Sequence, residues 1–135
     1  MKKNIFKLAF FIIFIVFIIG CEKQSNIDSI TIVSLNPSEN LSESTQVITV
    51  VVDYVLSSIN HAQLRIAFTN PNNVNTFLTV SSQDVIVTRG SGSHTFNPTV
   101  TPKDWGQEGD YRVMVLLIQQ GGTTSLANEI KTLYF

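Results

Sequence analysis

Hydrophobic and polar residues alternate with a period of two along most of the chain after residue 29. In the segment Gln63–Phe68, for example, Leu64, Ile66 and Phe68 fall on one side and polar or small residues fall on the other. This period is typical of β-strands that bury one face. The same alternation, or a dense run of β-branched residues, predicts further strands at Ile30–Leu35, Gln46–Tyr54, Val74–Val80, Asp84–Thr88, His94–Val100, Tyr111–Ile118 and Leu126–Phe135.

Clusters of turn-forming residues separate these strands. Asn70–Asn73, Gly90–Gly92 and Gln120–Thr123 are the clearest of them, and each predicts a turn. No segment keeps helical spacing over ten residues. Seven or eight short strands with turns between them predict an all-β fold, an antiparallel β-sandwich. Pro98 fits such a sheet only in an edge strand or a bulge.

The segment Trp105–Val113 resembles the entry to strand F of immunoglobulin-like and fibronectin III-like domains. The resemblance implies an immunoglobulin-like sandwich over about residues 27–135, with Tyr111 forming the tyrosine corner and Trp105 packing beneath the preceding loop. Val113 stands where antibody-type domains carry their second cysteine, which excludes that subfamily. A transthyretin-like sandwich is an alternative topology that strand patterns alone leave open.

The strand Tyr111–Ile118 is apolar on both faces. If Tyr111 and every second residue after it face the core, then Met114, Leu116 and Ile118 lie on the outer face. An antiparallel sandwich strand normally presents a polar outer face to water, and an exposed apolar patch tends to mark a partner site. These three residues are therefore candidate partner-binding positions. The alternatives are that the C-terminal strand or a loop covers them, or that a bulge changes the register.

The front of the chain has the pattern of an export signal. Leu8–Ile19 is an unbroken apolar run of twelve residues behind Lys2 and Lys3, whereas a membrane-spanning helix needs about 20. The run ends in Ile18-Ile19-Gly20-Cys21, which resembles the bacterial lipobox. The resemblance implies cleavage between Gly20 and Cys21 and a lipid on Cys21, the protein's single cysteine. An uncleaved anchor helix and an ordinary signal peptide are the alternatives.

These boundaries predict three parts: a signal peptide at 1–20, a lipidated cysteine with a short tether at 21–29, and a sandwich domain at 30–135. The partner that this implies is a membrane, and we expect the outer membrane of a Gram-negative bacterium, on either its periplasmic or its surface face. Eight tether residues, Glu22–Ser29, reach at most about 26–29 Å when fully extended. The domain is therefore expected to work close to its bilayer.

The remaining charge and chemistry exclude several functions. From Cys21 onward there are 6 basic and 10 acidic residues and no basic cluster, so a nucleic-acid partner is not expected. His61 and His94 are far apart in sequence and have no ligand partners at metal-binding spacing. We predict no metal, no cofactor and no catalytic residue, and we interpret the acidic residues as solvated: Asp53, Asp84, Asp104, Glu108 and Asp110.

The pattern as a whole favours a non-catalytic, lipid-anchored module that binds or scaffolds a protein of the cell envelope. A small assembly lipoprotein of a secretion or envelope machine is one alternative. A binder of carbohydrate or another small ligand is a second alternative, in which the segment Asn70–Asn75 and Trp105 would form the site. The sequence leaves the oligomeric state open.

Overall fold

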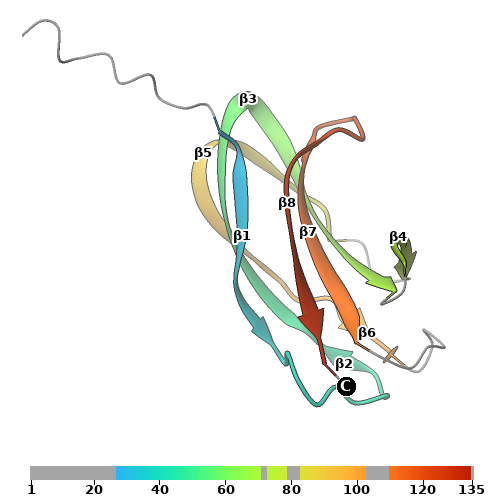
Figure 1. Ribbon diagram of the computed structural model, residues 1–135. Helices are drawn as coiled ribbons and strands as arrows, with labels where there is room; N and C mark the ends of the chain where they lie inside the picture. The colour runs from blue at the N-terminus through green and yellow to red at the C-terminus, as the bar shows by residue number, and fades with distance from the viewer. Residues whose placement is uncertain (1–26, 71–72, 79–82, 103–109, 135) are drawn as a thin grey trace, which may run out of the picture.

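The computed structural model describes residues 27–70, 73–78, 83–102 and 110–134. These residues form an all-β fold in which every strand pairing is antiparallel, and they contain no α-helix (Figure 1). The predicted fold class, an antiparallel β-sandwich, is confirmed. Its strands are β1 (Ser29–Asn36), β2 (Gln46–Val47), β3 (Thr49–Asn70), β4 (Asn73–Leu78), β5 (Val85–Phe96), β6 (Thr99–Val100), β7 (Tyr111–Gln119) and β8 (Ser125–Leu133).

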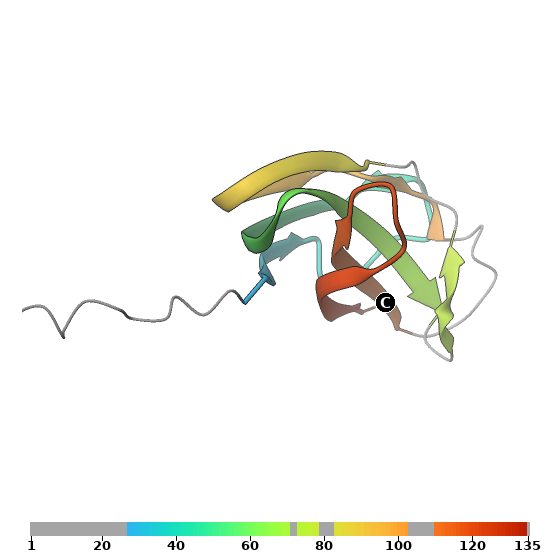
Figure 2. The ribbon, with the colours of Figure 1, turned by 90° about the horizontal axis from the view of Figure 1, so that it is seen from above.

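The long strand β3 belongs to both layers of the sandwich. Its first part lies between β1 and β5, whereas its second part lies between β7 on one side and β4 with the start of β5 on the other. The register shifts between Leu56 and His61, where β3 bends, and the sheet curls there (Figure 2). Strands that pass from one layer to the other through a bend are a known way to build a sandwich. The continuous sheet has the order β1-β3-β7-β8, with β4 and β5 also paired to β3, and β2 pairs with β6 separately.

The alternation of apolar and polar residues along the strands predicted most of the core. The hydrophobic faces expected along Gln46–Tyr54, Gln63–Phe68 and β7 are buried except for Tyr54, which is half-buried, and the two isoleucines at the start of β1 are buried as well. The structure buries the following residues of these faces: Ile30, Ile32, Ile48, Val50, Val52, Leu64, Ile66, Phe68, Tyr111, Val113, Val115 and Leu117. Because these side chains come from both layers, burying them holds the two layers together.

Two predicted boundaries are wrong. The segment Gly90–Gly92 was expected to form a turn, but it continues β5 without a break, and the strands expected at Gln46–Tyr54 and Gln63–Phe68 merge from Thr49 onward into β3. Gly92 pairs with Tyr54, whose ring lies over it, and a Cβ at position 92 would stand 2.7 Å from the Tyr54 hydroxyl oxygen. This glycine therefore makes room for an aromatic ring inside a sheet.

Side chains close the sandwich where β1 and β8 face each other. The Ile32 backbone N–H donates to Glu129 Oε2, and Lys131 Nζ donates to the Ile32 carbonyl oxygen. The register of β1 shifts between Ile32 and Ser34, so this hydrogen bonding coincides with a bulge. Glu129 and Lys131 thus form hydrogen bonds with the N–H and the carbonyl oxygen of Ile32 in the edge strand β1. Without them, these backbone groups could pair with a strand of another chain.

Candidate functional site

The outer face of β7 is only partly open. Met114 and Leu116 are half-buried, but Ile118 is only 5% exposed. The pairing of β7 with β8 shifts register between Leu117 and Ile118, and both of these neighbours are buried. The expectation that Ile118 lies on the surface is therefore wrong. Its pairing with Gln63 of β3 keeps the regular register, and the extra residue of the bulge, Leu126, belongs to β8.

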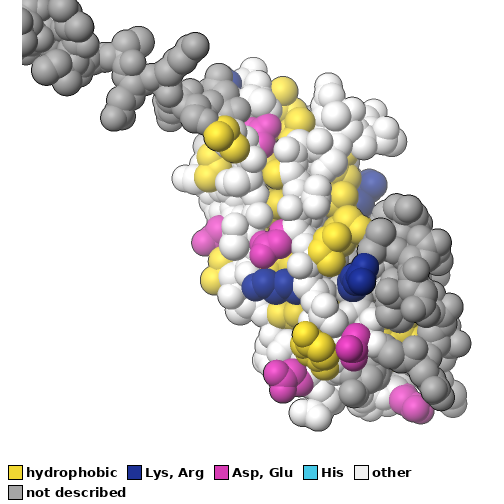
Figure 3. All heavy atoms as spheres, viewed as in Figure 1, with side chains coloured by type: hydrophobic (Ala, Val, Ile, Leu, Met, Phe, Trp, Pro, Cys, Tyr) yellow, Lys and Arg dark blue, Asp and Glu magenta, His cyan; other side chains and the backbone are white. Residues whose placement is uncertain are grey.

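Neighbouring strands extend the apolar strip that Met114 and Leu116 form. Ile130 of β8 pairs directly with Met114 and is 42% exposed, and sequence reasoning did not single it out. On the other side Met114 pairs with Ala67 of β3, which is buried. In Figure 3, hydrophobic side chains gather over the region of β7 and β8, with basic side chains beside them. We call Met114, Leu116 and Ile130 the β7–β8 strip.

An ion pair borders this strip. Arg65 of β3, which pairs with Leu116, binds Asp84 in a two-pronged contact: Nη2 lies 2.8 Å from Oδ2, and Nε lies 3.1 Å from Oδ1. The hydrogen bond to Asp84 raises the pKa of Arg65 further above its ordinary value. Gln63 also donates to Asp84. The strip therefore has an apolar centre and a charged border, a composition typical of protein interfaces.

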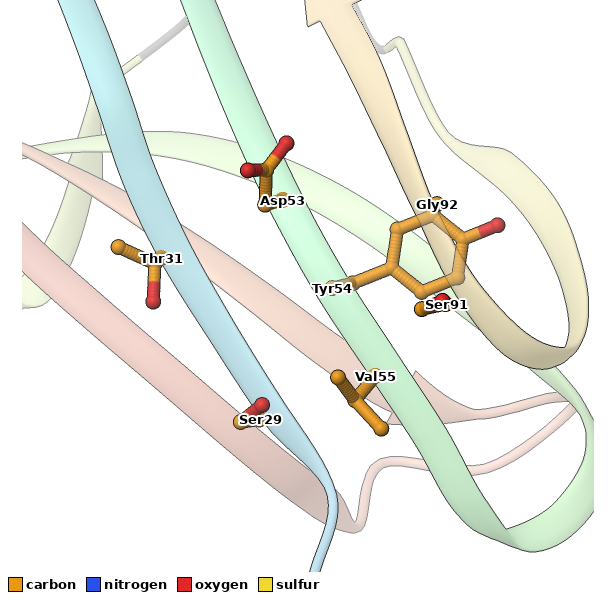
Figure 4. Close-up of a pocket in the computed structure, with 7 residues that line it drawn as sticks. All are labelled: Ser29, Thr31, Asp53, Tyr54, Val55, Ser91 and Gly92. Carbon is orange, nitrogen blue, oxygen red and sulfur yellow. The ribbon is translucent and has the colours of Figure 1, made fainter.

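A second site lies on the outer face of β1, β3 and β5. The register brings side chains of the three strands into two rows, Ser29–Val55–Ser91 and Thr31–Asp53–Ser93. A shallow depression of about 450 Å³ lies here (Figure 4). The residues that line it are Ser29, Thr31, Asp53, Tyr54, Val55, Ser91 and Gly92. Sequence reasoning missed this site, because Asp53 was interpreted as a solvated acid and Ser91 was assigned to a turn.

The bend of β3 is fixed beside the start of β1. Asp28 Oδ1 accepts hydrogen bonds from the backbone N–H groups of Ser57 (2.7 Å) and Ser58 (2.9 Å), and Arg89 Nε donates to the Ser57 carbonyl oxygen (2.9 Å). Burial alone would raise the pKa of Asp28, but the hydrogen bonds from Ser58 and Ser57 together outweigh it and lower this pKa. The ionised carboxylate is thus part of the folded structure.

Of the other predicted site residues, the structure describes Tyr111 but not Trp105, Gly20 or Cys21. Tyr111 starts β7 and is buried, as its place at the head of the core face predicted. Its proposed tyrosine-corner partner Trp105 lies outside the described residues, as do Gly20, Cys21 and the rest of the lipobox. Within the described residues no group of three or more His, Cys, Asp or Glu side chains is arranged to hold a metal ion. Over the same residues we find no helix long and apolar enough to cross a membrane.

The fold and these two surfaces define a small β-sandwich module. No family model and no curated protein matched the chain. Among solved structures, it is similar to part of a candidate beta-galactosidase from Bacteroides fragilis, with 14% identity and a TM-score of 0.54 over 80% of this chain and 17% of that one. This likeness supports the sandwich fold alone.

Two further solved structures are similar at a TM-score of 0.43, too low to carry an argument. One is a calcium-binding mutant of Bacteroides uniformis beta-glucuronidase 2, with 16% identity over 78% of this chain and 12% of that one. The other is a Kluyveromyces marxianus beta-glucosidase, with 13% identity over 81% and 14%. The chain spans less than a fifth of each of the three proteins.

Proposed function

We propose that this protein is an exported lipoprotein whose β-sandwich binds another protein of the cell envelope without catalysing a reaction. The lipobox Ile18-Ile19-Gly20-Cys21 supports the anchor, and the lipid on Cys21 would hold the domain at the outer membrane of a Gram-negative bacterium. The short tether keeps the domain, and therefore its partner, near the bilayer surface.

The β7–β8 strip is the observation that carries the binding role. Met114 and Ile130 are apolar cross-strand neighbours, and both keep solvent exposure on a sheet face. Arg65 and Asp84 add a polar border. A complementary partner would offer apolar side chains to the centre and hydrogen-bonding groups to this border.

Substitution of the strip tests the binding role. Full-length protein carrying Met114→Asp and Ile130→Asp would be compared with wild type by crosslinking and affinity capture from intact envelopes. The matched control is Val47→Asp, which charges a 51% exposed valine of β2, outside the strip. Both variants should keep the wild-type circular dichroism spectrum. We expect the strip variant to lose a specific partner that the control retains, and identical partner profiles would show that the strip does not bind that partner.

Lipid labelling tests the anchor separately. Cells expressing wild type or Cys21→Ser would be grown with radioactive palmitate, and the label on the immunoprecipitated protein would be measured. The lipoprotein proposal requires label on the wild type and none on Cys21→Ser. Equal labelling of the two proteins would show that Cys21 does not carry the lipid. This result would not bear on the binding role of the strip, which the substitutions in β7 and β8 test.

A further inference from the structure

The depression on β1, β3 and β5 offers polar groups that the fold does not use. Of the side chains in its two rows, only Ser93 makes a hydrogen bond within the described residues, from its Oγ to the Val52 carbonyl oxygen at 3.2 Å. Asp53, Thr31 and the serines at 29 and 91 have no such partner there. A face of this kind can exchange water for a ligand without breaking bonds that stabilise the fold.

The charge of the depression restricts the ligand. Asp53 is the one acidic residue in the lining, and no basic residue lines it. The nearest cation along β5 is Arg89, whose guanidinium is bound to the Ser57 carbonyl oxygen. An ionised carboxylate only accepts hydrogen bonds, and hydroxyls both donate and accept. The site therefore favours a ligand rich in O–H donors and disfavours an anion.

The volume of the depression and its apolar surface further restrict the class of ligand that it can bind. Val55 is 40% exposed and stands between Ser29 and Ser91 in its row, so it places an apolar surface beside the polar groups. A volume of about 450 Å³ lies within the range of small-molecule sites. A sugar ring combines hydroxyls around its edge with C–H groups on its faces, which matches this mixture.

We propose that the depression binds a neutral sugar. In this arrangement Asp53 accepts hydrogen bonds from neighbouring sugar hydroxyls, the hydroxyls of Thr31 and Ser91 complete the polar contacts, and Val55 contacts the C–H face of the ring. The site lies on β1, β3 and β5, whereas the β7–β8 strip lies on the outer face of the other layer. The sugar site therefore does not depend on the proposed protein-binding role.

Titration of the full-length protein in detergent micelles tests the site. Backbone amide signals would be followed by NMR during addition of glucose, galactose, mannose or N-acetylglucosamine, each up to about 10 mM. We expect at least one neutral sugar to shift the signals of residues 29–31, 53–55 and 91–93. The acids glucuronate and galacturonate, which replace a hydroxymethyl group by a carboxylate, should bind about tenfold more weakly or not at all, because Asp53 repels them.

Two amide substitutions provide the matched comparison. Asp53→Asn should weaken binding of that sugar by about tenfold or more, since a hydrogen bond to a charged acceptor is replaced by one to a neutral acceptor. Glu43→Gln makes the same change of charge at an exposed position outside the depression and should bind like wild type. The proposal is overturned if no neutral sugar shifts these signals, if Asp53→Asn binds as tightly as wild type, or if the acidic sugars bind equally well.

Discussion

Removal of the side chains that close the sandwich between β1 and β8 should lower its stability by a measurable amount. Glu129 accepts a hydrogen bond from the backbone N–H of Ile32, a residue that is 1% exposed. A hydrogen bond to a charged group contributes about 1.5–3 kcal/mol, and an unsatisfied buried N–H costs about 1–3 kcal/mol. Because Glu129 is half-buried, solvent screens part of this interaction. We therefore expect Glu129→Ala to lower the free energy of unfolding by about 1.5 kcal/mol, the low end of the range for a hydrogen bond to a charged group.

Lys131 contributes to the same contact through the other backbone group. It donates to the Ile32 carbonyl oxygen, and carbonyl oxygens tolerate loss of a partner somewhat better than N–H groups do. Lys131→Met keeps the aliphatic stem, and we expect it to cost about 1 kcal/mol. Since both side chains bind one residue, the double variant should depart from the sum of the single variants.

Urea unfolding followed by far-ultraviolet circular dichroism measures these changes. The midpoint should fall while the slope stays constant, because the surface exposed on unfolding is unchanged. For a domain of this size, a loss of 1.5 kcal/mol corresponds to a melting temperature lower by about 6–12 °C. Glu43→Ala is the control, since it removes an exposed carboxylate outside the contact. If Glu129→Ala and Glu43→Ala agree within about 0.3 kcal/mol, the contact does not stabilise the sandwich.

Two further predictions concern β5 and the start of β1. Gly92→Ala should destabilise the protein by about 1–3 kcal/mol in thermal unfolding, because a Cβ there meets the ring of Tyr54. Gly122→Ala, where the nearest atom is 3.5 Å away, should change it little, and equal effects would contradict the packing argument. Because hydrogen bonds hold the pKa of Asp28 below its ordinary value of 3.8, its charge stabilises the fold above that pH, and the contribution is lost as pH falls through the folded pKa. Asp28→Ala should thus lower the urea midpoint at neutral pH, and the gap to wild type should close in acid; a gap that does not depend on pH would refute it.

Alternation predicted the parts of the fold that local sequence determines. Leu64, Ile66 and Phe68 recur at every second position, so a strand can bury all three by turning one face to the core. The same reasoning placed Tyr111 and Val113 inward on β7, and the structure buries both. These predictions hold because side-chain direction along a regular strand depends on nothing beyond the strand itself.

The features of the fold that could not be predicted from the sequence depend on contacts between segments that are far apart in the chain. Gly90–Gly92 carries a strong local turn signal, but pairing with β3 and the ring of Tyr54 keep this segment in a strand. Glu129 and Lys131 have the polar character of solvent-exposed residues, yet they bind Ile32, from which they are separated by 97 and 99 positions in the chain. No pattern within one segment can show such a partner.

Both candidate surfaces follow from how strands are paired, because their residues come from neighbouring strands. Prediction along β7 alone included Ile118, which the structure buries beside a bulge in β8, and omitted Ile130, which joins the strip only through its pairing with Met114. Asp53 likewise belongs to a binding site only because register sets it between Thr31 and Ser93. A shift of one residue would turn every side chain of a strand to the opposite face. The bulges that set register therefore determine which residues can bind a ligand, and they act through hydrogen bonds between strands that the order of residues within one strand does not specify.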